Sequence, residues 1–138
     1  MKSYSRILIV DDNADYRHST AVLLAAHGYQ TFVASNGVEA LAIAELESPE
    51  VVLLDIGLPG FGGLEVARLI QRVPSMADAV IIAVSGRDGP DDIARSIAAG
   101  CLHHLGKPLD FAQLDVLLAG ISGYKNGVGS ATSSSGTN

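Results

Sequence analysis

Residues 51–55, Val-Val-Leu-Leu-Asp, constrain the fold of this chain more than any other stretch. Pro49 precedes them, and a glycine-rich loop over residues 57–63 follows. An uninterrupted apolar run of this length predicts a strand buried on both faces, as in a parallel sheet. An ionised carboxylate at the end of such a strand is costly unless it is paired or binds a metal. Because ligands of open α/β sheets bind outside the carboxyl ends of the strands, Asp55 is the candidate reactive residue.

Length and composition indicate one cytoplasmic domain. The 138 residues are 48% hydrophobic, enough to bury about two thirds of the surface that the unfolded chain would expose. No apolar run approaches the length of a membrane span or forms a signal peptide. The net charge of −6 argues against direct binding to nucleic acid or anionic lipid. The single cysteine, Cys101, excludes an internal disulfide and suits a reducing cytoplasm.

Strand and helix signals alternate five times along the chain. Strands are predicted over residues 6–10, 29–33, 51–55, 79–84 and 101–105, and helices over 14–27, 36–47, 64–72, 90–100 and 110–121. Asn13 is a plausible helix cap, and Asn36 and Asp110 each open a capping-box pattern. The amphipathic signal ends at Ile121. We therefore expect a folded domain over residues 1–121 and a flexible glycine-, serine- and threonine-rich tail or linker stub over 122–138.

This alternation predicts a three-layer α/β sandwich around a five-stranded parallel sheet. The expected strand order is 2-1-3-4-5, which places the ends of the first and third strands side by side at the switch point. Asp11 and Asp12 would then face Asp55, while Ser85 and Lys107 follow the next two strands. All five polar candidates are expected to share one rim of the sheet.

The chemistry of this rim predicts a phosphoacceptor site. Three carboxylates within a few ångströms repel one another unless a hard divalent cation takes up the charge, and Mg²⁺ fits such a set. A carboxylate nucleophile such as Asp55 can form an acyl phosphate. Lys107 and Mg²⁺ would neutralise the phosphoryl oxygens, and the Ser85 hydroxyl could donate a hydrogen bond to one of them.

The chain resembles the receiver domains of two-component response regulators, the CheY-like family, over residues 5–121. Four segments carry the resemblance, in this order along the chain: Ile-Leu-Ile-Val-Asp-Asp (7–12), Leu-Leu-Asp-Ile-Gly-Leu-Pro-Gly (53–60), Ser-Gly (85–86) and Lys-Pro (107–108). The resemblance implies a flavodoxin-like fold and a phosphoryl group passed from a kinase phosphohistidine to Asp55. Such a domain is a phosphoacceptor that assists its own phosphorylation and dephosphorylation, and it is not an enzyme in the usual sense.

The resemblance also implies a ligand set for the metal. Mg²⁺ would be held by Asp12, Asp55 and the backbone carbonyl of Gly57, with Asp11 acting mostly through a metal-bound water. In the family the Lys107–Pro108 peptide is cis, which would aim the lysine side chain into the site.

A conformational switch is implied as well. Ser85 would move toward the phosphoryl group, and the residue three positions before the lysine would follow it inward. Here that residue is His104, where the family usually has tyrosine or phenylalanine. We also expect Gly57, which lacks a side chain, and Arg87, which is large and cationic, to influence how readily water reaches the acyl phosphate. The dephosphorylation rate of Arg87→Ala would test the latter role.

Other interpretations of the same residues remain open. An aspartate-nucleophile phosphatase of the haloacid dehalogenase type would need Asp-x-Asp, but position 57 is glycine. A flavodoxin-like FMN carrier needs hydroxyl and amide donors after the first strand, where this chain has two carboxylates. A docking module could keep the receiver fold without phosphotransfer. Singly, the acidic residues could be helix caps, Ser85 a turn residue and Lys107 a solvated charge.

The output of the chain is less well defined by sequence. No DNA-binding or catalytic domain is recognisable after Ile121, so the signal is expected to leave by protein contact, by relay, or through a domain outside this sequence. The expected partners are a sensor histidine kinase or a histidine phosphotransfer protein, and a downstream protein target. The segments around Asp55 and Lys107 resemble receivers attached to hybrid kinases, whereas Met1 close to the first strand favours a free-standing chain. We expect a monomer or weak dimer.

Overall fold

A computed structural model describes residues 6–58, 62–87 and 89–126. The strands are β1 (Arg6–Val10), β2 (Gln30–Ala34), β3 (Val51–Asp55), β4 (Val80–Ser85) and β5 (His103–Gly106). The helices are α1 (Ala14–Ala26), α2 (Gly37–Glu47), α3 (Gly63–Gln71), α4 (Pro90–Ala98) and α5 (Phe111–Asn126), with a short 3-10 helix, η1, at Pro74–Met76. Residues 5–108 form one compact unit that contains every strand, and α5 belongs to a second unit. The predicted alternation is confirmed, whereas η1 was not predicted.

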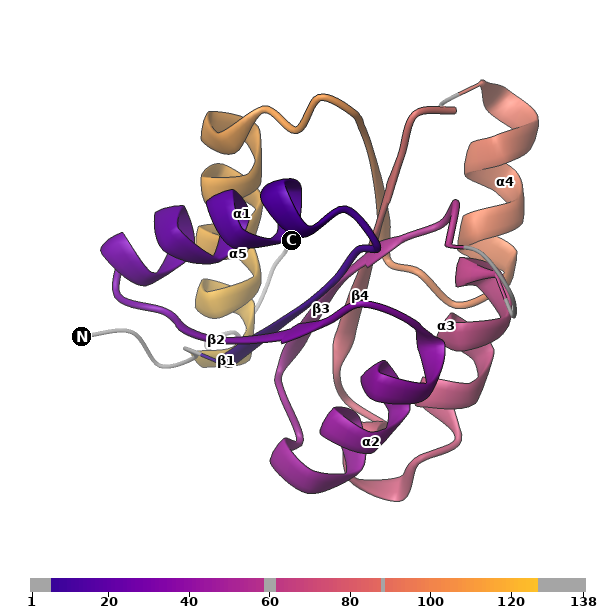
Figure 1. The fold of residues 1–138 in the computed structure, drawn as a ribbon, viewed down its shortest axis with the longest axis horizontal. Coiled ribbons are helices and arrows are strands. Elements are labelled where there is room, and N and C mark those ends of the chain that lie inside the picture. Colours follow the sequence, from indigo (N-terminus) through magenta and orange to yellow (C-terminus); the bar gives the residue numbers. More distant parts are fainter. Residues whose placement is uncertain (1–5, 59–61, 88, 127–138) are drawn as a thin grey trace. The chain divides into compact units, whose positions relative to one another are not determined.

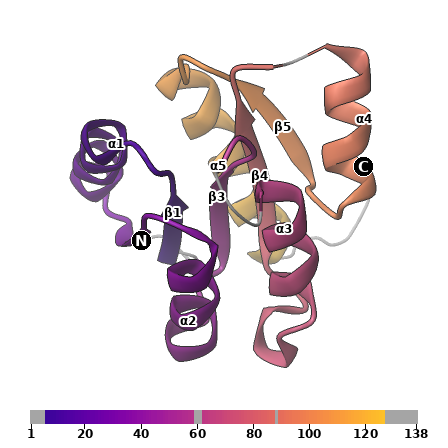
Figure 2. The ribbon, with the colours of Figure 1, turned by 45° about the vertical axis from the view of Figure 1, so that its right-hand side comes forward.

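The five strands form a single parallel sheet in the predicted order, β2-β1-β3-β4-β5 (Figure 2). Val10 at the end of β1 pairs with Leu54 of β3, so the residues that follow them lie at one edge of the sheet. Asp55 pairs with Val84, and Ser85 pairs with Gly106. The register therefore brings the ends of β1, β3, β4 and β5 to one rim.

Helices cover both faces of the sheet in the large unit. Successive strand residues point to opposite faces, so alternate residues of each buried strand face different helices. One face packs against α2 and α3 in a core cluster, while α1 lies on the other side of the sheet (Figure 1). The cluster includes Leu8, Val10, Val52, Leu54, Ile81 and Ala83 from the strands, with Ala40, Ala44, Val66, Ala67 and Ile70 from the helices. The predicted three-layer arrangement is confirmed.

The predicted side-chain caps of α1 and α2 form, but at α2 the returning hydrogen bond from Glu39 goes to Ser35 and not to Asn36. The Asn13 side chain accepts a hydrogen bond from the amide of Tyr16 at the start of α1. At α2 the Asn36 side chain accepts from the amide of Glu39, and the Glu39 carboxylate returns to the amide and hydroxyl of Ser35. These side chains satisfy helix amides that have no partner inside the helix.

The last helix is longer than the sequence predicted. α5 continues to Asn126, past the predicted end at Ile121, so the start of the expected tail is helical. Residues 127–138 of that tail, and residues 59–61 of the glycine-rich loop, lie outside the described residues. Among the helices described, none has the length and apolar composition that crossing a membrane requires.

Cys101 is expected to resist alkylation in the folded chain. It is 2% exposed, and burial raises the pKa of its thiol to about 11. Because the thiolate is the reactive form, almost none is present near neutral pH. Iodoacetamide should therefore label the native chain at least about tenfold more slowly than the chain in denaturant, as followed by intact mass. Equal labelling rates in the two states would contradict this prediction.

Candidate functional site

Three carboxylates gather where β1 and β3 end. Asp11 is 2% exposed, Asp55 is 7% exposed and Asp12 lies at the surface. One oxygen from each lies within 4.8 Å of the others, which is close enough for all three to bind one ion. Carboxylates at this spacing are the oxygen ligands that Mg²⁺ prefers, so the residues present fit the metal implied by the sequence.

The two buried carboxylates are fixed by the backbone that follows each strand. One oxygen of Asp11, Oδ1, accepts a hydrogen bond of 2.9 Å from the amide of Asn13. Asp55 Oδ1 accepts from the amide of Gly57 at the same distance. Both contacts are turns in which an aspartate side chain bonds to the amide two residues on. A side chain at position 57 would begin 3.5 Å from Asp55 Oδ1, so Gly57 leaves the acceptor open on that side.

Lys107 joins the two buried carboxylates. Its ammonium nitrogen Nζ lies 2.9 Å from Asp11 Oδ2 and 3.4 Å from Asp55 Oδ2. Burial by itself would lower the pKa of Lys107, but the hydrogen bond to Asp11 and the charge of Asp55 outweigh it and raise that pKa. The pKa of Asp55 is also raised, because burial disfavours its charged form more than Gly57 and Lys107 favour it. The site therefore holds a permanent cation beside a desolvated carboxylate.

Two further residues of α1 contribute to this site without having been predicted as site residues. The ring of Tyr16 lies 4.7 Å from Lys107 Nζ, a cation–π contact that covers the ammonium group. The Arg17 guanidinium donates to the backbone carbonyl of Asp11 at 2.8 Å. The first turn of α1 packs over the site once Asn13 caps it. One feature of the sequence could have identified both residues: they lie about one helical turn after Asp11 and Asp12.

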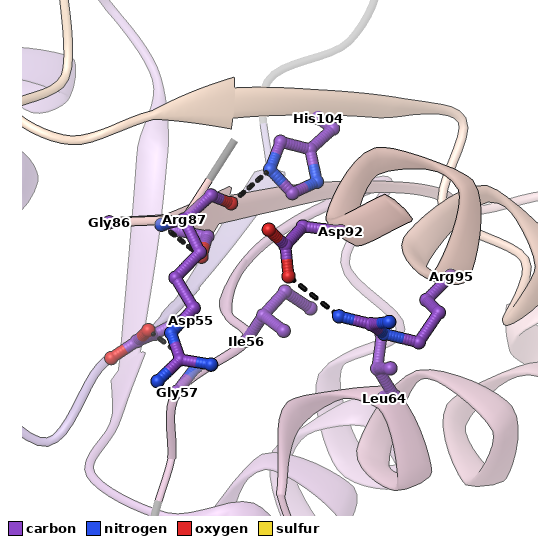
Figure 3. A pocket seen from close by; sticks show the side chains of 10 residues that line it. Asp55, Ile56, Gly57, Leu64, Gly86, Arg87, Asp92, Arg95 and His104 are labelled. Carbon is purple, nitrogen blue, oxygen red and sulfur yellow. Dashed lines mark hydrogen bonds and ion pairs between the residues drawn. The ribbon is translucent and has the colours of Figure 1, made fainter. Parts of the chain in front are cut away.

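The end of β4 forms the other side of the site. Ser85 is 7% exposed, and its hydroxyl oxygen accepts a hydrogen bond of 2.9 Å from the amide of Arg87. A cavity of about 410 Å³ opens here, lined by Asp55, Ile56, Gly57, Leu64, Ser85, Gly86, Arg87, Asp92, Arg95 and His104. In Figure 3 the Arg87 side chain extends toward Asp55 and Gly57, and the backbone carbonyl of Arg87 contacts the His104 ring.

The structure thus brings Asp11, Asp12, Asp55 and Lys107 together and places Ser85 beside Asp55 on the neighbouring strand. The Lys107–Pro108 peptide is cis, as the resemblance implied. The metal-binding role of the Gly57 carbonyl, the switch role of His104 and the effect of Arg87 on water access stay predictions.

Mg²⁺ is expected to stabilise the chain at neutral pH and to lose this effect in acid. A carboxylate must be deprotonated to bind metal, and the raised pKa of Asp55 lets protons compete at a higher pH than for an ordinary aspartate. Without metal, the shift contributes stability below the unfolded pKa of Asp55 that is lost as pH rises through its folded value. A bound cation should restore stability at neutral pH, raising Tm by roughly 3–6 °C when Mg²⁺ is tenfold above its Kd.

Thermal unfolding at about pH 7.5 and about pH 5 would measure this difference. Asp55→Asn should abolish the Mg²⁺ effect, and Asp91→Asn, which removes an exposed charge of α4 outside the cluster, should keep it. An equal Tm increase in both variants would show that the metal binds elsewhere.

Comparison with known proteins places the chain in a family. The response regulator receiver domain model matches residues 7–119. Sporulation initiation phosphotransferase F of Bacillus subtilis is 36% identical over 109 residues, which cover 79% of this chain and 86% of that protein. The autoinducer sensor kinase/phosphatase CqsS of Vibrio cholerae is 37% identical over 120 residues, 86% of this chain but 17% of that protein.

Solved structures agree with these sequence matches. A CheY-like response regulator receiver domain protein from Methanospirillum hungatei superposes with a TM-score of 0.82 at 29% identity, covering 91% of this chain and all of that one. The family match covers β2 to β5, all of β1 except its first residue, and the whole carboxylate cluster. The chain therefore belongs to the response regulator receiver domain family, whose members serve phosphorelay signalling.

Proposed function

We propose that this chain accepts a phosphoryl group on Asp55 in a Mg²⁺-dependent reaction and uses the modification to signal to another protein. The observation that carries the proposal is the position of Lys107, whose Nζ contacts both buried carboxylates. A cation fixed beside a buried nucleophile is what phosphoryl transfer requires, because the reaction depends mainly on positioning and on neutralising the phosphoryl oxygens.

In the proposed reaction Asp55 Oδ2 or Oδ1 attacks the phosphorus of a phosphohistidine. The P–O bond of an acyl phosphate forms as the P–N bond breaks, and the leaving electron pair returns to the imidazole nitrogen of the donor. Lys107 would neutralise one phosphoryl oxygen, and the Ser85 hydroxyl would donate to another. Asp11, Asp12, Asp55 and the Gly57 carbonyl would hold Mg²⁺, which supplies further charge neutralisation when bound. In dephosphorylation, water attacks the phosphorus, the P–O bond to Asp55 breaks, and inorganic phosphate leaves with the carboxylate restored.

The proposed partners follow from the same chemistry. A phosphohistidine donor would be a sensor histidine kinase or a histidine phosphotransfer protein, and a downstream protein would recognise the phosphorylated form. The names of the two sequence relatives, a phosphotransferase and a sensor kinase/phosphatase, support a place in such a relay. We propose a cytoplasmic monomer or weak dimer, with neither nucleic acid nor membrane as a direct partner.

Intact-protein mass after incubation with Mg²⁺ and a small phosphoryl donor would test the proposal. We expect one phosphoryl adduct, absent from Asp55→Asn and from a sample with chelator, and present in Asp91→Asn. No adduct in a folded, Mg²⁺-loaded chain would favour the alternative, a constitutive docking module that keeps the receiver fold without phosphotransfer.

A further inference from the structure

The His104 ring is held at both of its nitrogens. Nδ1 lies 2.8 Å from the hydroxyl oxygen of Ser96 on α4, and Nε2 lies 3.0 Å from the backbone carbonyl oxygen of Arg87 (Figure 3). Ser96 is completely buried, and its hydroxyl also lies 2.9 Å from the carbonyl oxygen of Ile93 in its own helix. A buried hydroxyl in an amphipathic helix is therefore aimed at one ring of the neighbouring strand.

This contact continues to the phosphoacceptor side of the site. The backbone of Arg87 contacts His104 through its carbonyl and Ser85 through its amide, which donates to the serine oxygen at 2.9 Å. Ser85 Oγ thus already accepts a hydrogen bond. The hydroxyl hydrogen of Ser85 can therefore be donated to the oxygen of a phosphoryl group at Asp55. A continuous path of three hydrogen bonds runs from Ser96 through His104 and Arg87 to Ser85.

We propose that Ser96 is a positioning residue for phosphoryl transfer: by fixing the His104 ring it holds the Arg87 backbone, which orients the Ser85 hydroxyl toward Asp55. This inference rests on the proposed function and adds a residue to it. Ser96 touches no reacting atom, so it acts only through His104.

The hydrogen atoms along this path define the state of the ring. A carbonyl oxygen only accepts, so His104 Nε2 must carry a hydrogen to contact Arg87. The Ser96 hydroxyl has one hydrogen, and if Ile93 receives it, His104 Nδ1 must carry a hydrogen as well. All three contacts therefore form together only when the ring is an imidazolium. With a neutral ring that carries its hydrogen on Nε2, the Ser96 hydroxyl donates to Nδ1 instead of Ile93, and the path from Ser96 to Ser85 keeps all three of its hydrogen bonds.

The charges around the ring are mixed. In the cavity, Arg87 comes from the loop after β4, Asp55 from β3, and Asp92 and Arg95 from α4. Asp92 and Arg95 form an ion pair of 2.7 Å (Figure 3). Lys107 and His103 lie on or next to β5, the strand of His104 itself.

The test measures the rate at which Asp55 acquires a phosphoryl group from a small donor. Ser96→Ala should slow this rate roughly fivefold, the factor expected for one lost hydrogen bond. His104→Phe should slow it by at least as much, and the double variant should be no slower than His104→Phe because both changes break one path.

His103→Phe is the matched control, since strand alternation turns His103 to the opposite face of β5. Its phosphorylation rate should equal that of the wild type. Either of two results would overturn the inference. One is a Ser96→Ala phosphorylation rate equal to that of the wild type, and the other is a double variant that is slower than His104→Phe by the full effect of Ser96→Ala.

A second measurement separates this inference from the proposed function. In the unphosphorylated chain, nitrogen-15 NMR should show His104 Nε2 bearing a slowly exchanging hydrogen, with the protection lost in Ser96→Ala. An absent phosphoryl adduct with this NMR pattern present would defeat the proposed function but leave the path intact. A His104 ring unaffected by Ser96→Ala would defeat the positioning role even if the adduct forms.

Discussion

A Lys107→Met variant is expected to accept phosphoryl groups at least about 100-fold more slowly than the wild type, while binding Mg²⁺ more tightly. The two effects have one cause. Lys107 Nζ is the cation that lies 2.9 Å from Asp11 and 3.4 Å from Asp55, so it both offsets their charge and competes with a metal for their oxygens. Its removal leaves two buried carboxylates in repulsion, which a divalent cation relieves. It also removes the group that would neutralise the phosphoryl oxygen.

Adduct formation by intact mass and Mg²⁺ affinity by calorimetry would measure the two effects separately. Arg68→Met is a suitable control because it removes a cation from a half-exposed ion pair with Glu65 on α3, away from the cluster. That variant should change both quantities less than about twofold. Transfer in Lys107→Met within threefold of wild type would mean that the lysine only offsets the charge of the two carboxylates in the resting chain and takes no part in the reaction.

The second large effect is expected from Gly63→Ala, at the first residue of α3. A methyl group there would lie 2.5 Å from both the Asp55 carbonyl oxygen and the Ile56 Cα atom. Both neighbours are backbone atoms at the end of β3, so they cannot move aside as a flexible side chain could. We expect a loss of about 2–3 kcal/mol in the free energy of unfolding, a Tm lower by roughly 8–15 °C, and slower phosphorylation because the acceptor strand shifts.

A second glycine-to-alanine substitution distinguishes the effect of this close backbone contact from the general effect of replacing glycine on stability. Gly120→Ala lies within α5, where a methyl group would meet no atom within 4 Å. Because alanine favours helix over glycine, that variant should gain about 0.5–1 kcal/mol. Denaturant unfolding of both variants would check the two signs. A Gly63→Ala chain as stable as wild type would mean that α3 can move away from β3 without cost.

Much of the fold was predictable from local pattern. Apolar runs ending in polar residues identified the strands, and the switch-point rule then placed Asp11, Asp55 and Lys107 at one rim before any contact was known. Strand ends were misplaced by a residue or two, as for β5, because apolar content marks burial and not the hydrogen-bond ladder. β5 begins at His103, whereas Cys101 is buried just before it.

Contacts that join distant elements were not predictable in the same way. The Tyr16 ring covers Lys107, and only the three-dimensional structure shows how α1 begins over the rim. Ser96 carried no signal, since a serine in a helix is ordinarily exposed or bonded to its own backbone. Ile93 and Ile97, four residues apart on α4, are 38% and 47% exposed, although the same spacing elsewhere marks a buried face.

The salt bridge between Asp11 and Lys107 spans 96 residues of the chain. During synthesis the acidic residues after β1 are made early, and the Lys107 ammonium group that pairs with them is made only after β5. Contacts of such long range form late, after the intervening segments have folded. A nascent or truncated chain that ends before Lys107 would therefore present the carboxylates without the ammonium group. Under the proposed function, competence to receive a phosphoryl group would therefore report that the sheet has formed from β1 to β5.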